Sequence, residues 1–356
     1  MSKITYLFGA GASWESIPVV GELERAFQIV KEWNEEIHKS IPQKTSYSDG
    51  EKKTIRSCKT FDALLQTICF NTPIYKTIDT FAKKLTITDD IHDLHNVKAA
   101  LSLFFTLWQE SSIRDIEFEL LKKNGRKFKE IDTRYFGLLT NYLQRDNGKI
   151  ILDPNVNFIS WNYDTQLERS LAFILDKSVN DIPNLFNIHP FNQQETPQII
   201  HLNGVAGYYK TESNNANLFR EKNPLGNRPP KEVLKDLVDF IGSVEKMSIN
   251  VDEYFTFAWE SDKINRAVTE AEKILSETDT LVIIGYSFPN FNNEIDKKLL
   301  AIFLEQSNRK NNLKVYYQDP RANKTLLSKR FGIDESIIEI DSTNMDQFIL
   351  PLERIS

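Results

Sequence analysis

The segment Thr280 to Gly285 constrains the fold most, because it holds a continuous apolar run, Leu281-Val282-Ile283-Ile284. Such a run is typical of a strand buried on both faces of a parallel sheet. Further strand patterns are found at residues 4–8, 156–160, 198–202, 313–317 and 337–340. Helical patterns separate several of them, at residues 264–275, 294–304 and 324–331. Strands that alternate with helices predict an α/β fold with a parallel sheet and right-handed crossovers.

The pattern of the segment between the first two predicted strands indicates a large helical insertion. Apolar residues recur at helical spacing from Thr60 to Leu143, with no rhythm of short strands and turns. A chain of 356 residues has room for about two domains. We therefore expect residues 1–30 and 151–356 to form the sheet domain and residues 31–150 to form the insertion.

Composition and charge exclude several classes of protein. Hydrophobic residues make up 40% of the chain and charged residues 26%, as in ordinary globular proteins. The net charge is −6, so direct binding of nucleic acid over the whole surface is not expected. Cys58 and Cys69 are too few for a four-thiolate zinc site or a disulfide framework. The first residues lack a signal-peptide pattern, and no run approaches the ~18 apolar residues of a membrane span, which predicts a cytoplasmic protein.

A glycine-rich loop, Gly9-Ala10-Gly11-Ala12-Ser13, follows the first predicted strand. Two glycines allow backbone amides to approach a pyrophosphate, and a following helix end favours negative charge. The third glycine of the dinucleotide fingerprint would fall at position 14, which is Trp14. An ordinary dehydrogenase is therefore disfavoured. The structural alternative is a tight turn between strand and helix.

A second motif, Trp161-Asn162-Tyr163-Asp164, follows the strand at residues 156–160. Ligands of open α/β sheets bind outside the carboxyl ends of the strands. In extended chain Asn162 and Asp164 point the same way, so an amide and a carboxylate could hold ribose hydroxyls or a water. The alternative is that Asp164 caps the helix predicted from Thr165 to Ile174.

Two more motifs follow later strands. In Ile200-His201-Leu202-Asn203-Gly204, His201 closes an apolar strand and could act as a general base near pH 7. The alternative is a histidine at the edge of the core with satisfied hydrogen bonds. In Gly285-Tyr286-Ser287-Phe288-Pro289, Gly285 allows close backbone approach and Ser287 offers a hydroxyl to ribose or phosphate. The alternative there is a plain strand-to-helix loop.

In this order the four motifs resemble those of the sirtuin-like fold, and more closely those of the sirtuin-like NADases of bacterial anti-phage defence systems. In that family a Gly-Ala-Gly-Ala-Ser loop binds NAD, an Asn-Tyr-Asp segment supplies a catalytic Asn, and a Leu-His-Gly segment supplies a His. A Gly-Tyr-Ser-Phe/Leu-Pro segment adds cofactor contacts. The resemblance spans most of the chain except parts of the insertion. It implies a Rossmann-like, sirtuin-like sheet with a large helical insertion.

Two departures from the family pattern matter. The family's Leu-His-Gly reads Leu202-Asn203-Gly204 here, so Asn203 stands at the strict His position and His201 lies two residues earlier. Residues two apart share a strand face, so we favour His201 as the base and Asn203 as a secondary polar contact. If the backbone follows the family closely, Asn203 occupies the base position. The paired cysteines of the zinc-containing protein deacetylases are also missing, so neither deacetylation nor zinc is expected.

The resemblance implies an NAD⁺ hydrolase that gives ADP-ribose and nicotinamide and depletes NAD in anti-phage defence by abortive infection. Asn162 would orient the ribose hydroxyls and the attacking water, and His201 would accept a proton. Residues expected to contact NAD⁺, the substrate, are Gly9, Ala10, Gly11, Ala12, Ser13, Asp164, Asn203, Gly204, Gly285 and Ser287.

Such an activity must be held off in a healthy cell. We therefore expect control by homo-oligomerisation or by a partner defence protein, such as a HerA-like ATPase. Two other functions are weighed against hydrolysis: a catalytically silent module that senses NAD or ADP-ribose, and an ADP-ribosyltransferase.

Two further clusters of charged or titratable residues have simple structural explanations. His92 and His95, with Asp89, Asp90 and Asp93, have the spacing of metal ligands on a helix, but a polar helix start explains them better. A basic run, Lys122, Lys123, Arg126, Lys127 and Lys129, is explained by a solvated surface, with a nucleic-acid or protein contact as the alternative.

Overall fold

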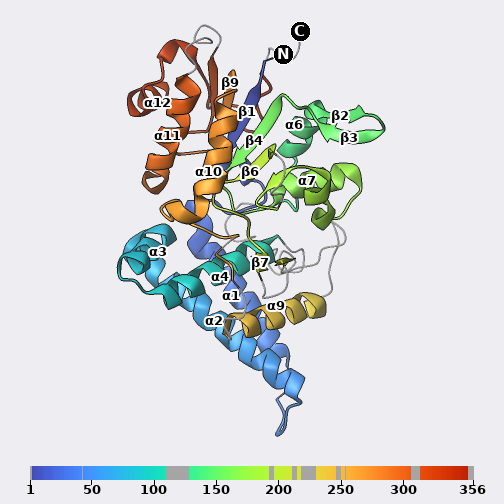
Figure 1. Ribbon diagram of the computed structural model, residues 1–356. Helices are drawn as coiled ribbons and strands as arrows, with labels where there is room; N and C mark the ends of the chain where they lie inside the picture. The colour runs from blue at the N-terminus through green and yellow to red at the C-terminus, as the bar shows by residue number, and fades with distance from the viewer. Residues whose placement is uncertain are drawn as a thin grey trace. The chain divides into compact units, whose positions relative to one another are not determined.

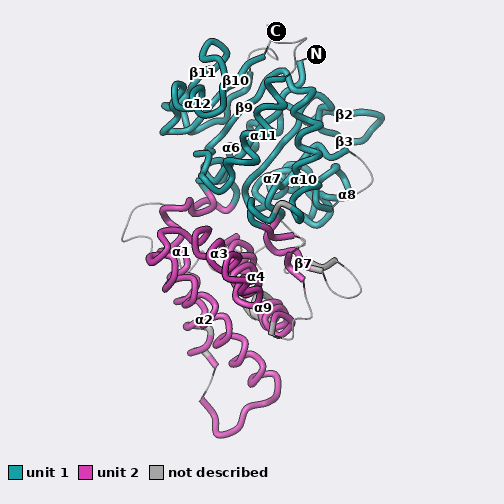
Figure 2. Tube along the Cα trace, turned by 60° about the vertical axis from the view of Figure 1, so that its left-hand side comes forward, with its two compact units in different colours: residues 1–15, 131–204, 257–356 teal, residues 16–130, 205–256 magenta. Residues whose placement is uncertain are grey.

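The computed structural model describes residues 2–41, 43–109, 128–191, 196–210, 215–217, 230–245, 250–252, 254–305 and 313–351. The chain divides into two compact units (Figure 2). Unit 1 comprises residues 1–15, 131–204 and 257–356, and unit 2 comprises residues 16–130 and 205–256.

Unit 1 contains a seven-stranded sheet in which every neighbouring pair of strands is parallel (Figure 1). In sheet order the strands are β11 (Ile338–Asp341), β10 (Lys314–Gln318), β9 (Thr280–Ile284), β1 (Ile4–Phe8), β4 (Val156–Ser160), β6 (Ile199–His201) and β5 (Ile188–His189). The α/β fold with a parallel, Rossmann-like sheet is thus confirmed. Each strand predicted from sequence is present within a residue or two of its expected bounds.

Helices cover both faces of this sheet. One face carries α10 (Ser261–Leu275), α11 (Asn293–Leu304) and α12 (Lys324–Phe331), and the other carries α6 (Arg134–Tyr142), α7 (Gln166–Leu175) and α8 (Ile182–Leu185). Side chains alternate between the two layers, as the period of a strand requires. Leu7 and Ile159 pack with the α10 layer, whereas Tyr6 and Phe158 pack with the α6 layer. The strands are therefore apolar on both faces, as their sequences predict.

Unit 2 is largely helical. It contains α1 (Leu23–Ser40), α2 (Asp49–Tyr75), α3 (Ile78–Ile87), α4 (Ile91–Trp108) and α9 (Pro230–Glu245), with the short hairpin β7 (Tyr208–Lys210) and β8 (Asn215–Asn217). A capping box of Ser48 and Glu51 starts α2. The helices pack through aromatic contacts, such as Phe27 against Phe104 with ring centroids 4.4 Å apart.

The unit boundaries differ from the domain boundaries expected from sequence. Residues 131–150 lie in unit 1, because α6 packs against the sheet and leads into a hairpin of β2 (Leu143–Asp146) and β3 (Lys149–Leu152). Residues 205–256 lie in unit 2, where Asp239 on α9 accepts a hydrogen bond of 2.6 Å from Lys53 on α2. Residues 16–30 also lie in unit 2.

Candidate functional site

The four sequence motifs meet at one edge of the sheet. They follow β9, β1, β4 and β6, which are consecutive neighbours in the sheet and all end at the same edge. The connection after β1 leads to β4 on one side, whereas the connection after β9 leads to β10 on the other. Such a reversal marks the place where open α/β sheets bind ligands.

The glycine loop after β1 packs backbone to backbone on the loop after β9. A Cβ at Gly9 would lie 2.6 Å from the Cα of Tyr286, and a Cβ at Gly11 would lie 2.7 Å from the Cα of Gly285. Gly285 itself has φ +58°, a conformation that glycine adopts without strain. Both glycine motifs are therefore explained by the close approach of these two loops.

This packing also uses amides of the glycine loop. The N–H of Gly9 donates to the carbonyl of Ile284 (3.0 Å), and that of Gly11 donates to the carbonyl of Gly285 (2.9 Å). The N–H of Ala12 donates to the carbonyl of Gly9 (2.8 Å). The amide of Ser13 belongs to the 3-10 helix Ala10–Ser13 and the residue is fully buried, so an anion bound by this loop would depend on the amide of the exposed Ala10.

Arg134 on α6 supports the glycine loop, a role that no sequence motif indicates. Its Nη2 donates to the carbonyls of Gly11 (3.1 Å) and Ala12 (3.0 Å). Its Nε donates to Asp132 Oδ1 (2.8 Å), so the buried guanidinium is paired with a buried carboxylate. The arginine fixes the two loop carbonyls in place while Asp132 balances its charge.

Asn162 and Asp164 contact the same loop through Ser13. Asn162 Nδ2 donates to the carbonyl of Gly9 (2.9 Å) and lies 3.4 Å from Ser13 Oγ. Ser13 Oγ donates to Asp164 Oδ1 (2.9 Å), which also accepts from the N–H of Gln166 (3.0 Å) near the start of α7. Burial raises the pKa of Asp164 to about 6, against the opposing effect of these hydrogen bonds. Asp164 therefore supports the helix start and also belongs to the cluster.

His201 lies beneath this cluster and is almost completely buried, with 1% of its surface exposed. Its Nδ1 lies 3.3 Å from the carbonyl oxygen of Asn162, and its Nε2 lies 2.6 Å from Glu168 Oε1 on α7. Burial disfavours the charged imidazole, but the Glu168 carboxylate outweighs this and raises the pKa of His201. Acting as a base toward a substrate would require His201 to give up one of these two contacts.

The remaining predicted residues occupy the same edge. Asn203 and Gly204 follow β6 and are nearly buried, with Asn203 7% exposed. Ser287 is exposed in the loop after β9. The next residue, Phe288, has φ +53°, which is unusual for a bulky side chain.

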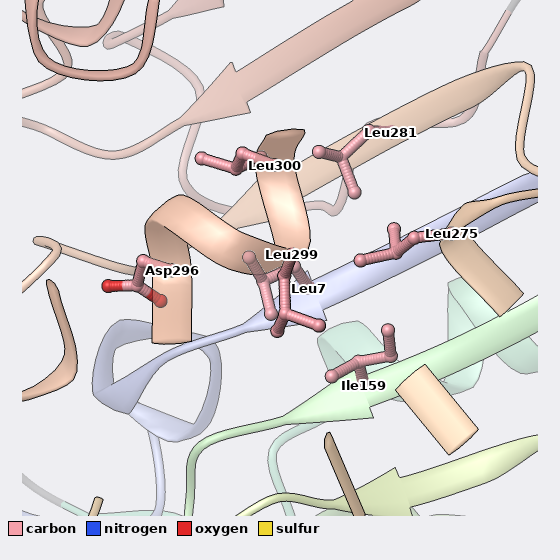
Figure 3. Close-up of a pocket in the computed structure, with 7 residues that line it drawn as sticks. All are labelled: Leu7, Ile159, Leu275, Leu281, Asp296, Leu299 and Leu300. Atoms are coloured by element: carbon pink, nitrogen blue, oxygen red, sulfur yellow. The ribbon is translucent and has the colours of Figure 1, made fainter. Parts of the chain in front are cut away.

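A small cavity lies between the sheet and α11 in the same unit (Figure 3). It is lined by leucines, with Leu7, Ile159 and Asp296 among its walls, and its volume of about 10 Å³ admits at most one water molecule. Asp296 Oδ2 accepts a hydrogen bond from the hydroxyl of Tyr286 (2.9 Å), and burial raises the pKa of Asp296 to about 8. The cavity is too small for a nucleotide.

The cluster that contains His92 lies on α4 in unit 2. Of the basic run, Lys122, Lys123, Arg126 and Lys127 lie outside the described residues. His92 Nδ1 lies 3.1 Å from Asn96 Nδ2 on α4. In the described ranges, no three His, Cys, Asp or Glu side chains are grouped to hold a metal ion. Among the described helices, none has both the length and the apolar composition to cross a bilayer.

Comparisons with known proteins give no relative. No family model matches the chain, and neither the curated proteins nor the solved structures include a significant match.

Proposed function

We propose that this protein is an NAD⁺ glycohydrolase whose substrate lies across the carboxyl ends of β9, β1, β4 and β6. The observation that carries the proposal is the hydrogen bond from Asn162 Nδ2 to the carbonyl of Gly9. It joins the proposed catalytic residue to the proposed pyrophosphate loop at the strand-order reversal of the sheet.

The substrate would be bound by groups from several loops. The amide of the exposed Ala10 would donate to the pyrophosphate, and Ser287, also exposed, would bind a ribose or a phosphate through its hydroxyl. Asn162 would face the nicotinamide ribose through its side-chain Oδ1, since its Nδ2 is committed to Gly9.

In the reaction, the bond between the ribose C1′ and the nicotinamide nitrogen breaks, and its electron pair leaves with nicotinamide. The ribose becomes cation-like, so a fixed negative charge nearby lowers the barrier. Above its pKa of about 6, Asp164 supplies such a charge in a buried setting. Asn162 Oδ1 would orient the water that adds to C1′, and the proton of this water would pass to solvent as ADP-ribose forms.

A second candidate is an NAD- or ADP-ribose-binding module without turnover. It is favoured by His201, whose two ring nitrogens both face protein oxygens. In this case Asn203 would stand at the position of the family's catalytic His and would give no proton acceptor.

Chromatographic detection of nicotinamide and ADP-ribose, together with calorimetry of NAD⁺ binding, tests both candidates. We expect turnover by the wild type and its loss in Asn162→Ala. Asn141→Ala is the matched control, because Asn141 is an exposed asparagine whose Nδ2 donates within α6, to the carbonyl of Gly137. Binding without turnover would replace hydrolysis by the second candidate. Neither binding nor turnover would refute both.

A further inference from the structure

Glu168 is a buried carboxylate next to the proposed site, and no sequence motif singled it out. It lies on α7, the helix that directly follows the Asn162–Asp164 loop, and 2% of its surface is exposed. Its Oε1 is 2.6 Å from His201 Nε2. Its Oε2 is buried and has no hydrogen-bond partner among the described residues. Among the described residues, His201 is therefore the main group that stabilises the negative charge of the Glu168 carboxylate.

The positions of the protons on His201 follow from its neighbours. A carbonyl oxygen only accepts hydrogen bonds, so the Nδ1 that faces Asn162 carries a proton. Nε2 lies 2.6 Å from the Glu168 carboxylate. A second proton, on Nε2, makes the pair an imidazolium and a carboxylate. The pair is held between β6 and α7, out of contact with solvent.

This pair completes the set of contacts that fixes Asn162. The N–H of Asn162 donates to Ser160 Oγ (3.0 Å), and its carbonyl accepts from His201 Nδ1. Its side-chain Nδ2 donates to the carbonyl of Gly9 (2.9 Å). Three of its four polar groups are thus held by the protein, and no donor among the described residues contacts Oδ1.

We propose that Glu168 is a positioning residue, which acts through a charged His201 to hold the Asn162 peptide and aim its side-chain Oδ1 at the ligand. The role rests on the proposed function of Asn162, but the existence of the charged pair does not. Because the position of one reacting or orienting group strongly affects rate, loosening this hold lowers kcat more than it changes KM.

Other charges that face His201 affect its protonation and must be considered in the test. They are Glu168 on α7, Asp164 in the loop after β4, and His189 on the neighbouring strand β5. Burial lowers the pKa of His189 to about 4, so it is neutral at pH 7 and does not replace the charge of His201. Glu168 is the only one of the three within hydrogen-bond distance of the ring.

Glu168→Gln keeps the size and the hydrogen-bonding reach of the side chain and removes its charge. The control is Glu35→Gln, an acid on α1 that pairs with Lys39. Nitrogen-15 NMR of histidine-labelled protein reports the protonation of His201 directly. In the wild type we expect both ring nitrogens to stay protonated from pH 6 to 8. In Glu168→Gln we expect a neutral ring with the proton on Nδ1.

With NAD⁺ as the probe, we expect kcat in Glu168→Gln to fall about 10-fold with KM changed less than threefold, because the neutral ring still donates from Nδ1 to the Asn162 carbonyl but more weakly than a charged ring. The double variant with His201→Gln should fall no further than either single variant, because the two residues act as one unit. A neutral His201 in the wild type overturns the charged pair, even if Glu168→Gln fails to fold. If His201 is neutral in Glu168→Gln but kcat is unchanged, the positioning role is overturned. Wild-type protein that shows the charged pair but neither binds nor cleaves NAD⁺ refutes the proposed function instead.

Discussion

Gly285→Ala tests the close packing of the two loops on which the site depends. A Cβ at this position would lie 2.3 Å from the carbonyl carbon of Gly11 and 2.4 Å from the nitrogen of Ala12. Ordinary contact begins near 3.4 Å, so the two backbones would have to separate by about 1 Å. This would break the hydrogen bond from the N–H of Gly11 to Gly285, at about 1 kcal/mol.

The remaining cost comes from overpacking and from backbone conformation. Overpacking costs about 1–3 kcal/mol. A non-glycine residue at φ +58° costs a further ~1–2 kcal/mol. We therefore expect Gly285→Ala to lower the free energy of unfolding by about 3–6 kcal/mol and to abolish NAD⁺ binding.

Gly332→Ala is the matched control for this prediction. Gly332 has φ +71° at the end of α12, but a Cβ there meets nothing within 4 Å. Only the conformational cost of ~1–2 kcal/mol applies. Urea denaturation of both variants, with unchanged m-values, measures the difference. Equal losses of stability in the two variants would refute the close approach of the loops.

Three further predictions concern buried charges. Arg134→Met leaves Asp132 buried without its partner, so we expect a loss of about 3–5 kcal/mol in urea denaturation; a loss below 1 kcal/mol would contradict the pairing. Because the pKa of Asp296 is raised from 3.8 to about 8, the folded protein keeps a proton that the unfolded chain releases, and stability falls as pH rises between these values. Asp296→Asn should therefore gain stability relative to wild type between pH 5 and 8, by up to ~1.4 kcal/mol per pH unit. The same pH dependence of the free energy of unfolding in both proteins would refute this. If Asp164 must be charged, NAD⁺ cleavage should rise through pH 6 and stay low at all pH values in Asp164→Asn; a flat wild-type profile would exclude that role.

Six of the seven strands were predictable because each carries a local signal, whereas the two-residue strand β5 does not. The runs at Ile4–Phe8 and Thr280–Ile284 are apolar on both faces, and only a parallel sheet covered by helices on both sides buries both. The glycines after these strands were also recognisable from sequence, because glycine after a buried strand indicates a close approach of two backbones. Their partner was not, because the contact between Gly11 and Gly285 joins loops far apart in sequence.

The buried charges could not be predicted, because their partners come from other elements. Glu168 reads as a polar residue in a helix, and only the packing of α7 over β6 places it beside His201. Arg134 likewise reads as a residue at a helix start. His201 is the clearest case. The strand periodicity predicted that His201 and Asn203 share a face, but it could not predict that α7 covers this face. His201 is therefore buried against α7.

The most direct test of the account is a crystal structure of the protein with ADP-ribose, the product of the proposed reaction. We expect the pyrophosphate to accept a hydrogen bond from the amide of Ala10 and the distal ribose to lie within hydrogen-bond distance of Asn162 Oδ1. ADP-ribose bound elsewhere, or an Asn162 side chain turned away from a bound ribose, would contradict it.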